Sequence, residues 1–145
     1  MISIRDMQQE DAGAVAALEA QIFSKPWSRQ GFLEALNLEN TIFLVAEEDS
    51  QIIGYIGMYF SMDEGEITNV AVEPCMRCHG IGGMLIEAMQ KEAGQRGLSS
   101  IVLEVRISNE SAIRLYERNG FVNRGVRKGF YELPKEDAYI MIYGQ

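Results

Sequence analysis

The residues with the clearest capacity for chemistry lie in one short stretch, Arg77-Cys78-His79-Gly80-Ile81-Gly82. It follows a strand-like segment and opens a segment whose apolar residues recur at helical spacing. Glycines in such a place let the backbone approach a ligand closely, and the first turn of a helix presents unpaired N–H groups to an anion. The stretch therefore predicts a pyrophosphate site, with a purely structural glycine pair as the alternative. It is neither a dinucleotide fingerprint nor a P-loop, because no G-x-G-x-x-G pattern appears and no Gly-Lys-Ser/Thr follows.

The same region contains a C-x-x-C-H pattern formed by Cys75, Cys78 and His79, which in exported proteins attaches haem. The first residues, MISIRDMQQEDA, lack the basic and apolar regions of a signal peptide, so we expect a cytoplasmic chain without haem. His79 is the only histidine, so no second Cys/His cluster completes a zinc site. We therefore expect no metal. Two interpretations of the thiols stay open: a redox-sensitive pair, or side chains that can be replaced without loss of activity.

Two further residues, Glu104 and Tyr116, have side chains suited to proton transfer. Polar and apolar residues alternate over 100–107, which places Glu104 on the face opposite its apolar neighbours. It stands near the carboxyl end of the predicted strand, where open sheets bind ligands, although a solvated surface glutamate would fit the same pattern. Tyr116 lies within a helix that Asn109 can cap, and a core tyrosine at helical spacing is the alternative there.

The elements that would position these residues are strands and helices in alternation. The strand–helix–strand unit over 66–107 is too long for a hairpin and implies a parallel crossover. We therefore predict an α+β fold with a mixed sheet, in one domain over residues 1–145. Ser28 and Asn109 are the expected helix caps, and Gly120 is the expected left-handed residue after the last helix. The predicted strands are 2–6, 41–47, 52–60, 66–72, 100–107, 121–130 and 138–143, and the predicted helices are 8–23, 28–37, 80–97 and 110–119.

Composition and charge exclude several classes of protein. The hydrophobic fraction of 47% and the charged fraction of 23% are ordinary for a globular chain, so a disordered or fibrous protein is excluded. The longest apolar runs are too short for a transmembrane helix. The net charge of −8 argues against nucleic acid as a partner, because nucleic-acid affinity rests on basic residues that neutralise phosphates. The same charge is compatible with a basic peptide or a polyamine.

At this point the sequence resembles the GNAT acetyltransferases, whose acyl-CoA signature is Arg/Gln-x-x-Gly-x-Gly/Ala. Arg77, Gly80 and Gly82 match it, and a second family element follows as Ser108-Asn109-x-x-Ala112-x-x-Leu115-Tyr116-x-x-x-Gly120-Phe121. The resemblance implies a mixed, mostly antiparallel seven-stranded sheet with about four helices, and acetyl-CoA as the cosubstrate. It implies that loop amides hold the pyrophosphate, that the asparagine hydrogen-bonds the CoA arm and that the tyrosine lies beside its sulfur. The cofactor-binding residues expected from it are Val70, Ala71, Val72, Arg77, Cys78, His79, Gly80, Ile81, Gly82, Gly83, Asn109 and Tyr116.

A narrower resemblance concerns three other runs, Phe23–Ser28, Leu103–Asn109 and Phe130-Tyr131 ahead of Glu136-Asp137-Ala138. They look like the bacterial ribosomal-protein-alanine acetyltransferases, which cap the N-terminal alanine of a small-subunit ribosomal protein. That likeness implies a basic protein N-terminus as the acceptor, without nucleic acid or membrane, and we expect a monomer or weak dimer. Trp27 would line the acceptor groove or pack between the first two helices.

The chemistry of acetyl transfer assigns the roles of the candidate residues. An N-terminal amine has a pKa of about 7.7–8.0, against about 10.4 for lysine, so one carboxylate suffices as its base. Glu104 is the expected base, as the resemblance also implies, and Tyr116 the expected acid. An amide within Val70-Ala71-Val72 is the expected oxyanion donor. Two alternatives stay open: an acetyltransferase of a small amine such as a polyamine or aminoglycoside, and a non-catalytic acyl-CoA-binding or redox module.

Overall fold

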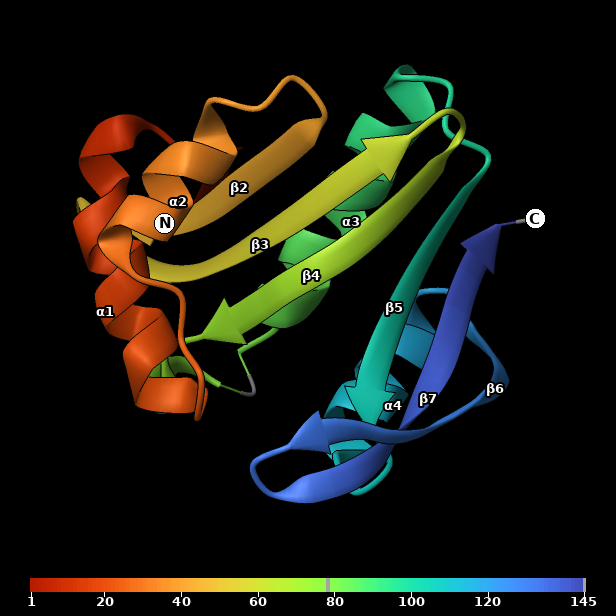
Figure 1. The fold of residues 1–145 in the computed structure, drawn as a ribbon. Helices are drawn as coiled ribbons and strands as arrows, with labels where there is room; N and C mark the ends of the chain where they lie inside the picture. The colour runs from red at the N-terminus through yellow and green to blue at the C-terminus, as the bar shows by residue number, and fades with distance from the viewer. Residues whose placement is uncertain (78, 145) are drawn as a thin grey trace.

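The computed structural model describes residues 1–77 and 79–144, and these form one mixed sheet with helices on both faces (Figure 1). The strand order is β1-β2-β3-β4-β5-β7-β6, and the β4–β5 pair is parallel while the others are antiparallel. This confirms the predicted α+β class and the parallel crossover. The strands are β1 Ser3–Asp6, β2 Thr41–Glu48, β3 Gln51–Ser61, β4 Glu64–Val72, β5 Ser100–Arg106, β6 Val122–Glu132 and β7 Lys135–Gly144, and the α-helices are α1 Ala12–Ile22, α2 Arg29–Leu36, α3 Ile81–Gln95 and α4 Glu110–Arg118.

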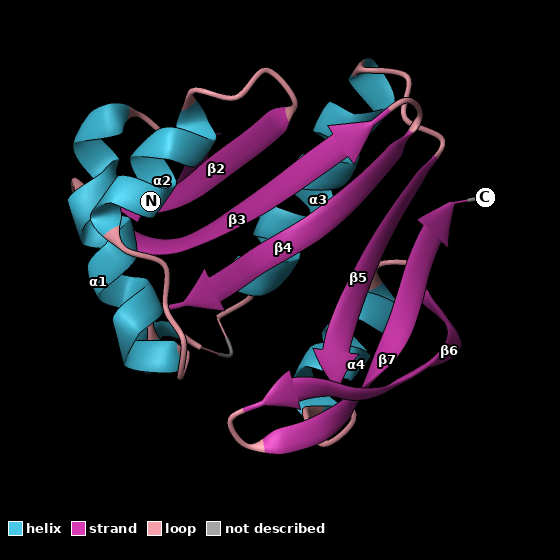
Figure 2. Cartoon of the chain, in the orientation of Figure 1, coloured by secondary structure: helices cyan, strands magenta, loops and turns pink. Residues whose placement is uncertain are grey.

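The helices form two unequal layers (Figure 2). α1 and α2 lie on one face against β2, β3 and β4, and α3 covers the opposite face, where it also contacts α4. The core under α3 and α4 is aliphatic, with Ile86, Met89 and Leu103 fully buried. The core under α1 and α2 is aromatic, because Phe32, Phe43 and Tyr55 meet there. The α1–α2 layer stops at β4, so the same face of β5 and β7 carries no helix in Figure 2.

Local signals placed most element ends within one residue, although α1 begins at Ala12 where a helix from residue 8 was predicted, and β7 begins at Lys135 where a strand from residue 138 was predicted. Ser28 caps α2, since its Oγ accepts from the Gly31 amide at 3.0 Å, and Asn109 caps α4 by accepting from the Ala112 amide at 3.3 Å. Gly120 adopts the expected left-handed conformation, with φ of 89°. The strand predicted over 100–107 is one residue too long, because β5 ends at Arg106 and Ile107 turns out to be 38% exposed.

The parallel pair opens into a fork. β4 and β5 are paired only where Glu64–Glu66 faces Ser100–Val102. Beyond that point the two strands diverge (Figure 1), and we call residues 67–72 of β4 and 103–106 of β5 the β4–β5 fork. A bulge begins the β4 arm, because Gly57 pairs with Asn69 while Met58 pairs with Ile67. Bulges re-aim side chains and often stand next to active sites.

Candidate active site

The first turn of α3 presents backbone amides that no side chain caps. It follows β4 through a short 3₁₀ turn, Pro74–Met76, so it begins beside the open end of the β4–β5 fork. Gly80 is its N-cap in the left-handed conformation, with φ of 80°, and no side chain caps the helix. The Met84 amide bonds to the Gly80 carbonyl at 3.1 Å. The amides of Ile81, Gly82 and Gly83 therefore have no partner within the helix and point out of its N-terminus.

The two glycines of the motif serve different purposes. Gly80 supplies a backbone conformation that a side chain would strain, and no atom lies within 4 Å of the place where its Cβ would stand. At Gly82 an added Cβ would lie 2.9 Å from Leu115 Cδ2 on α4. Gly82 thus lets α4 pack closely against the start of α3, which is a structural role, and the ligand interpretation of the pair stays a prediction.

The remaining loop residues are exposed. Arg77 is exposed, and so is His79, whose Nδ1 lies 3.0 Å from the Arg77 carbonyl oxygen and 3.1 Å from that of Met76. Cys75 is exposed with a free thiol. The predictions for Cys78, as a loop ligand and as one of two thiols, fall outside the described residues.

Of the three β4 amides expected to include the oxyanion donor, two face the β4–β5 fork. The Glu73 amide donates to the Ile53 carbonyl at 2.8 Å, which sets the alternation of bonded and non-bonded pairs between β3 and β4. Ala71, opposite Tyr55, therefore directs its amide at β3 and not into the fork, which leaves Val70 and Val72 as the predicted oxyanion donors. Val70 and Val72 direct their amides into the fork.

Glu104 lies on the β5 arm of the fork and is half-buried, with 12% of its side chain exposed. Its Oε2 accepts from Arg127 Nη1 at 3.0 Å. Burial raises the pKa of Glu104, the neighbouring carboxylate of Glu66 raises it further, and Arg127 opposes both effects. A carboxyl group whose pKa lies above its usual range takes up a proton at neutral pH more readily than an ordinary surface glutamate does.

The ring of Tyr116 packs in the core, while its hydroxyl group keeps contact with solvent. Its ring centroid lies 5.8 Å from that of Phe121, and 9% of the residue is exposed. Among the described residues its hydroxyl has no hydrogen-bond partner, yet no fully buried polar atom there lacks one. The hydroxyl therefore keeps an edge open to solvent. Burial raises the pKa of Tyr116, and the nearby phenol of Tyr131 raises it further, so the hydroxyl stays protonated at neutral pH.

Tyr131 on β6 lies beside Arg106, and sequence reasoning assigned it no role. The Arg106 guanidinium lies over its ring at 4.2 Å. Burial raises the pKa of Tyr131, Arg106 lowers it, and Glu104 and Glu136 raise it. Tyr131 thus influences the ionisation of Tyr116 and is influenced by Glu104. Only the Phe130-Tyr131 resemblance pointed to it, because β6 is far away in the sequence.

The side-chain oxygen of Asn109 caps α4, while its side-chain nitrogen does not take part in the cap. Its Oδ1 accepts from the Ala112 amide and from Ser111 Oγ, each at 3.3 Å. The Nδ2 group has no protein partner among the described residues, so it is the part of Asn109 available to an acetyl-CoA arm.

A buried carboxylate, Glu19 of α1, hydrogen-bonds the β4 arm of the fork, and sequence analysis missed it. It is 2% exposed, and its oxygens accept from the Tyr55 hydroxyl, from Asn69 Nδ2 at 3.1 Å and from the Trp27 amide at 2.7 Å. Glu19 thereby joins α1 to the β4 bulge and to the segment that opens α2. Its position on the apolar stripe of α1, between Leu18 and Ile22, was the available signal.

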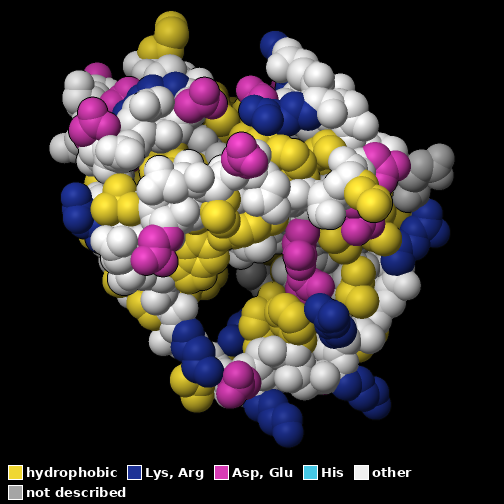
Figure 3. Space-filling view, turned by 45° about the horizontal axis from the view of Figure 1, so that its top comes forward, with side chains coloured by type: hydrophobic (Ala, Val, Ile, Leu, Met, Phe, Trp, Pro, Cys, Tyr) yellow, Lys and Arg dark blue, Asp and Glu magenta, His cyan; other side chains and the backbone are white. Residues whose placement is uncertain are grey.

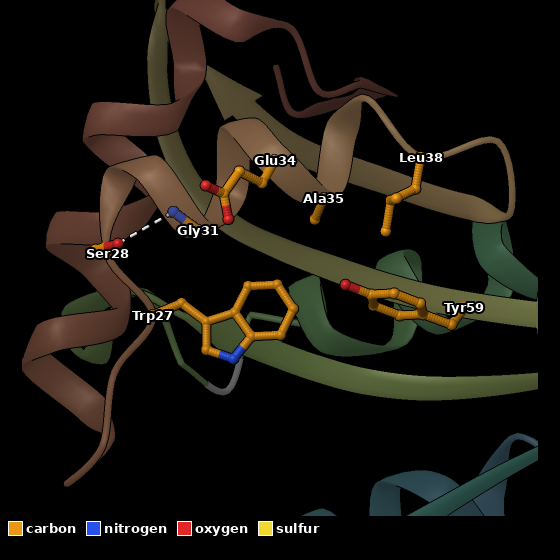
Figure 4. A pocket seen from close by; sticks show the side chains of 7 residues that line it. All are labelled: Trp27, Ser28, Gly31, Glu34, Ala35, Leu38 and Tyr59. Carbon is orange, nitrogen blue, oxygen red and sulfur yellow. Dashed lines mark hydrogen bonds between the residues drawn. The ribbon is translucent and has the colours of Figure 1, made fainter.

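A pocket of about 540 Å³ lies between α2 and β3 on the face that α1 and α2 cover (Figure 4). Trp27 stands at its border, with ring centroids 5.2 Å from Phe32 and 6.4 Å from Tyr59. Trp27 thus packs on a buried ring of α2 and also lines a pocket, and that this pocket is the acceptor groove stays a prediction. Figure 3 shows a hollow on this side of the molecule, with hydrophobic, acidic and basic side chains on its rim. The lining residues are Trp27, Ser28, Gly31, Glu34, Ala35, Leu38 and Tyr59.

In residues 1–77 and 79–144, no three His, Cys, Asp or Glu side chains are grouped so as to hold a metal ion. No helix in the same ranges is long and apolar enough to cross a membrane.

Comparison with known proteins gives a consistent result. Residues 12–121 match the Acetyltransferase (GNAT) family. A Bacillus subtilis protein named as a candidate [ribosomal protein bS18]-alanine N-acetyltransferase is 36% identical over 141 residues, which cover 96% of this chain and 93% of that protein. The crystal structure of the ribosomal-protein-S18-alanine N-acetyltransferase from Escherichia coli superimposes with a TM-score of 0.91 at 29% identity, covering 99% and 94% of the two chains. A chain in the NatC complex bound to Gag peptide and CoA gives a TM-score of 0.86 at 26% identity, with coverage of 99% and 98%.

Proposed function

Because the chain belongs to the GNAT acetyltransferase family, we propose that it acetylates a protein's N-terminal α-amine, with the N-terminal alanine of a small-subunit ribosomal protein as the acceptor. That it is an N-acetyltransferase using acetyl-CoA follows from the family. The acceptor rests on the names of the relatives from Bacillus subtilis and Escherichia coli. The observation that carries the proposal is the β4–β5 fork, which has unpaired amides of α3 near its open end and the half-buried Glu104 on its β5 arm.

The proposed roles follow from what each side chain can do with a proton. Glu104 takes the proton that the attacking amine loses as its nitrogen forms the new C–N bond. Val70 or Val72 donates its amide to the oxygen that becomes negative on the thioester carbon. Tyr116 gives its proton to the thiolate that leaves as the C–S bond breaks. The raised pKa of Glu104 suits an acceptor of protons near neutral pH, and burial keeps Tyr116 protonated until the thiolate forms.

The residues around the fork also fit the parts of acetyl-CoA. The amides of Ile81, Gly82 and Gly83 and the positive end of the α3 dipole suit a pyrophosphate. The Nδ2 group of Asn109 would donate to a carbonyl of the pantetheine arm. These residues bind and orient the cosubstrate, and the thioester it supplies is the group that reacts.

The test is a comparison of acceptors with the intact protein. A peptide that begins with alanine, its N-acetylated form, spermidine and an aminoglycoside are each incubated with acetyl-CoA, and CoA release and peptide mass are measured. We expect rapid acetylation of the free α-amine, none of the blocked peptide, and slow reaction of the small amines. Faster turnover of a small amine would contradict the proposal that the acceptor is a protein N-terminus, but it would not contradict acetyl transfer itself. Tight CoA binding without turnover of any acceptor would favour a non-catalytic module.

A further inference from the structure

The pocket lined by Trp27 and Tyr59 lies in line with the proposed base across the face of the sheet. Tyr59 on β3 is directly opposite Glu66 on β4, and Glu66 is directly opposite Val102 on β5. Directly opposite residues point their side chains to the same face. Glu104 follows Val102 by two residues on the same strand and therefore shares that face. The order across the sheet is thus Glu104, Glu66, Tyr59 and then the pocket.

The spacing of this row matches a short length of peptide. Strands lie about 4.8 Å apart and rise about 3.3 Å per residue, which places the Cα atoms of Glu104 and Tyr59 about 12 Å apart. An extended peptide advances at the same rise of about 3.3 Å per residue, so an acceptor with its amine at Glu104 brings its second or third residue towards Tyr59. A long side chain on that residue reaches the pocket.

The lining of the pocket determines the chemistry of that side chain. Trp27 and Tyr59 present aromatic rings, and Leu38 and Ala35 add apolar surface (Figure 4). Glu34 is exposed at the border, and none of the seven lining residues is basic. Glu66 is also exposed, between the pocket and Glu104. Aromatic faces beside carboxylates attract a guanidinium or an ammonium group on an apolar stem.

We propose that this pocket is the subsite for a basic side chain, arginine in the first instance, at the second or third residue of the acceptor peptide. Glu66 is the specificity-determining carboxylate, and the rings of Trp27 and Tyr59 hold the stem and the cationic group. This inference rests on the proposed function, since it assumes a peptide whose α-amine reaches Glu104. Planar guanidinium suits the site better than ammonium does, because it stacks on rings and pairs with a carboxylate at the same time.

The experiment uses peptides that differ only in one charge. Peptides beginning with alanine carry arginine or its neutral isostere citrulline at the second or the third residue, and kcat/KM is measured for each pair. At one of the two positions we expect arginine to be preferred roughly tenfold, the size of one cation–π contact together with one exposed ion pair. Glu66→Gln should reduce that preference several-fold. The preference is a ratio of two peptides on the same variant, so any change at Glu104 that affects both peptides alike cancels from it. Tyr59→Leu should reduce it as well.

The control removes the same charge elsewhere. Glu87 is exposed on α3, which covers the opposite face of the sheet, so Glu87→Gln should leave the preference at its wild-type value. Equal kcat/KM for arginine and citrulline at both positions, with the alanine α-amine still acetylated, would overturn the subsite and leave the proposed function standing. Equal loss in the Glu66 and Glu87 variants would show a general charge effect and would also overturn it. Absence of acetylation from all peptides would instead contradict the proposed function.

Discussion

The two sides of the β4–β5 fork offer different kinds of groups to a ligand, backbone amides on one side and side chains on the other. On the acetyl-CoA side the proposed contacts come mostly from the backbone, namely the first-turn amides of α3 and the β4 amides of Val70 and Val72. On the acceptor side they come from side chains on separate strands, with Glu66 on β4 and Glu104 on β5, and Glu104 accepts a hydrogen bond from Arg127 on β6. A site of backbone amides binds a group common to all acyl donors. A site of side chains can change its specificity through single substitutions without altering the fold.

The two sides should therefore respond differently to substitution. Changes on the acceptor side should alter turnover or acceptor preference and leave acetyl-CoA binding as it is. Changes near the glycines should alter acetyl-CoA binding, because they move the backbone that contacts it.

The largest effect is expected for Glu104→Gln, which should lower kcat by one to three orders of magnitude, because general-base assistance is worth about 10²–10⁴-fold. The rise in melting temperature on adding acetyl-CoA, which reports binding to the folded chain, should stay the same as in wild type. Higher pH should restore part of the rate, since more of the α-amine is then already neutral. A wild-type kcat at pH 7 would place the base elsewhere, with Glu66 next in line.

The pKa of Glu104 gives a second test of the same residue. Because that pKa is raised, the active carboxylate is lost as pH falls through a value above the usual range for glutamate, and kcat/KM should fall there. Arg127→Met removes the charge that lowers this pKa, so it should shift the acidic limb of the profile to higher pH. A raised carboxyl pKa stabilises the folded state only while the group is protonated. At neutral pH Glu104→Gln should thus not lower the free energy of unfolding. If the acidic limb of the pH profile does not shift in the Arg127 variant, that limb does not report the ionisation of Glu104.

Tyr116→Phe is expected to have the next largest effect, a fall in kcat of roughly ten- to a hundredfold, since one proton donor to the leaving thiolate is lost. The acceptor amine distinguishes it from the Glu104 variant. With a more basic amine, such as a peptide that begins with β-alanine, the deficit of Glu104→Gln should grow, because deprotonation becomes harder. The deficit of Tyr116→Phe should be the same for both amines. A deficit that grew in both variants would indicate that Tyr116 acts on the amine and not on the thiolate.

The same contrast explains what the sequence could predict. Gly80, Gly82 and the Asn109 cap act within a few residues of their own positions, so their spacing alone indicated the anion site and the helix starts. Glu104 was found because a period of two is also a local property. The proximity of Glu66, Arg127 and Tyr131 to Glu104 depends on the register between four strands, and it could not be predicted from any one of them. The C-x-x-C-H pattern shows the opposite limit, because it is a local match to a motif of unrelated proteins that only the rest of the sequence argued against.

An intermediate effect is expected for Gly82→Ala on the acetyl-CoA side. The added Cβ would lie 2.9 Å from Leu115 Cδ2, so the start of α3 must shift. We expect KM for acetyl-CoA to rise several-fold with little change in kcat. Gly94→Ala is the matched control in the same helix, because its Cβ would meet no atom within 4 Å. It should raise the free energy of unfolding by about 0.8–1.0 kcal/mol and leave KM unchanged. Equal KM values in the two variants would mean that the contact with α4 does not position the loop.

The smallest effect is expected when Cys75 and Cys78 are changed together to serine. Cys75 is exposed, and direct transfer from the thioester to the amine includes no step that needs a protein thiol. We expect kcat/KM to stay within a few-fold of wild type, and to respond to neither oxidant nor reductant in the double variant. If wild type loses activity on oxidation while the variant does not, the pair is a redox-sensitive switch near the loop. A loss of more than a hundredfold in the variant under reducing conditions corresponds to about 2.7 kcal/mol of activation free energy. A loss of that size would require a thiol in the reaction itself and would contradict direct transfer with Glu104 as the base.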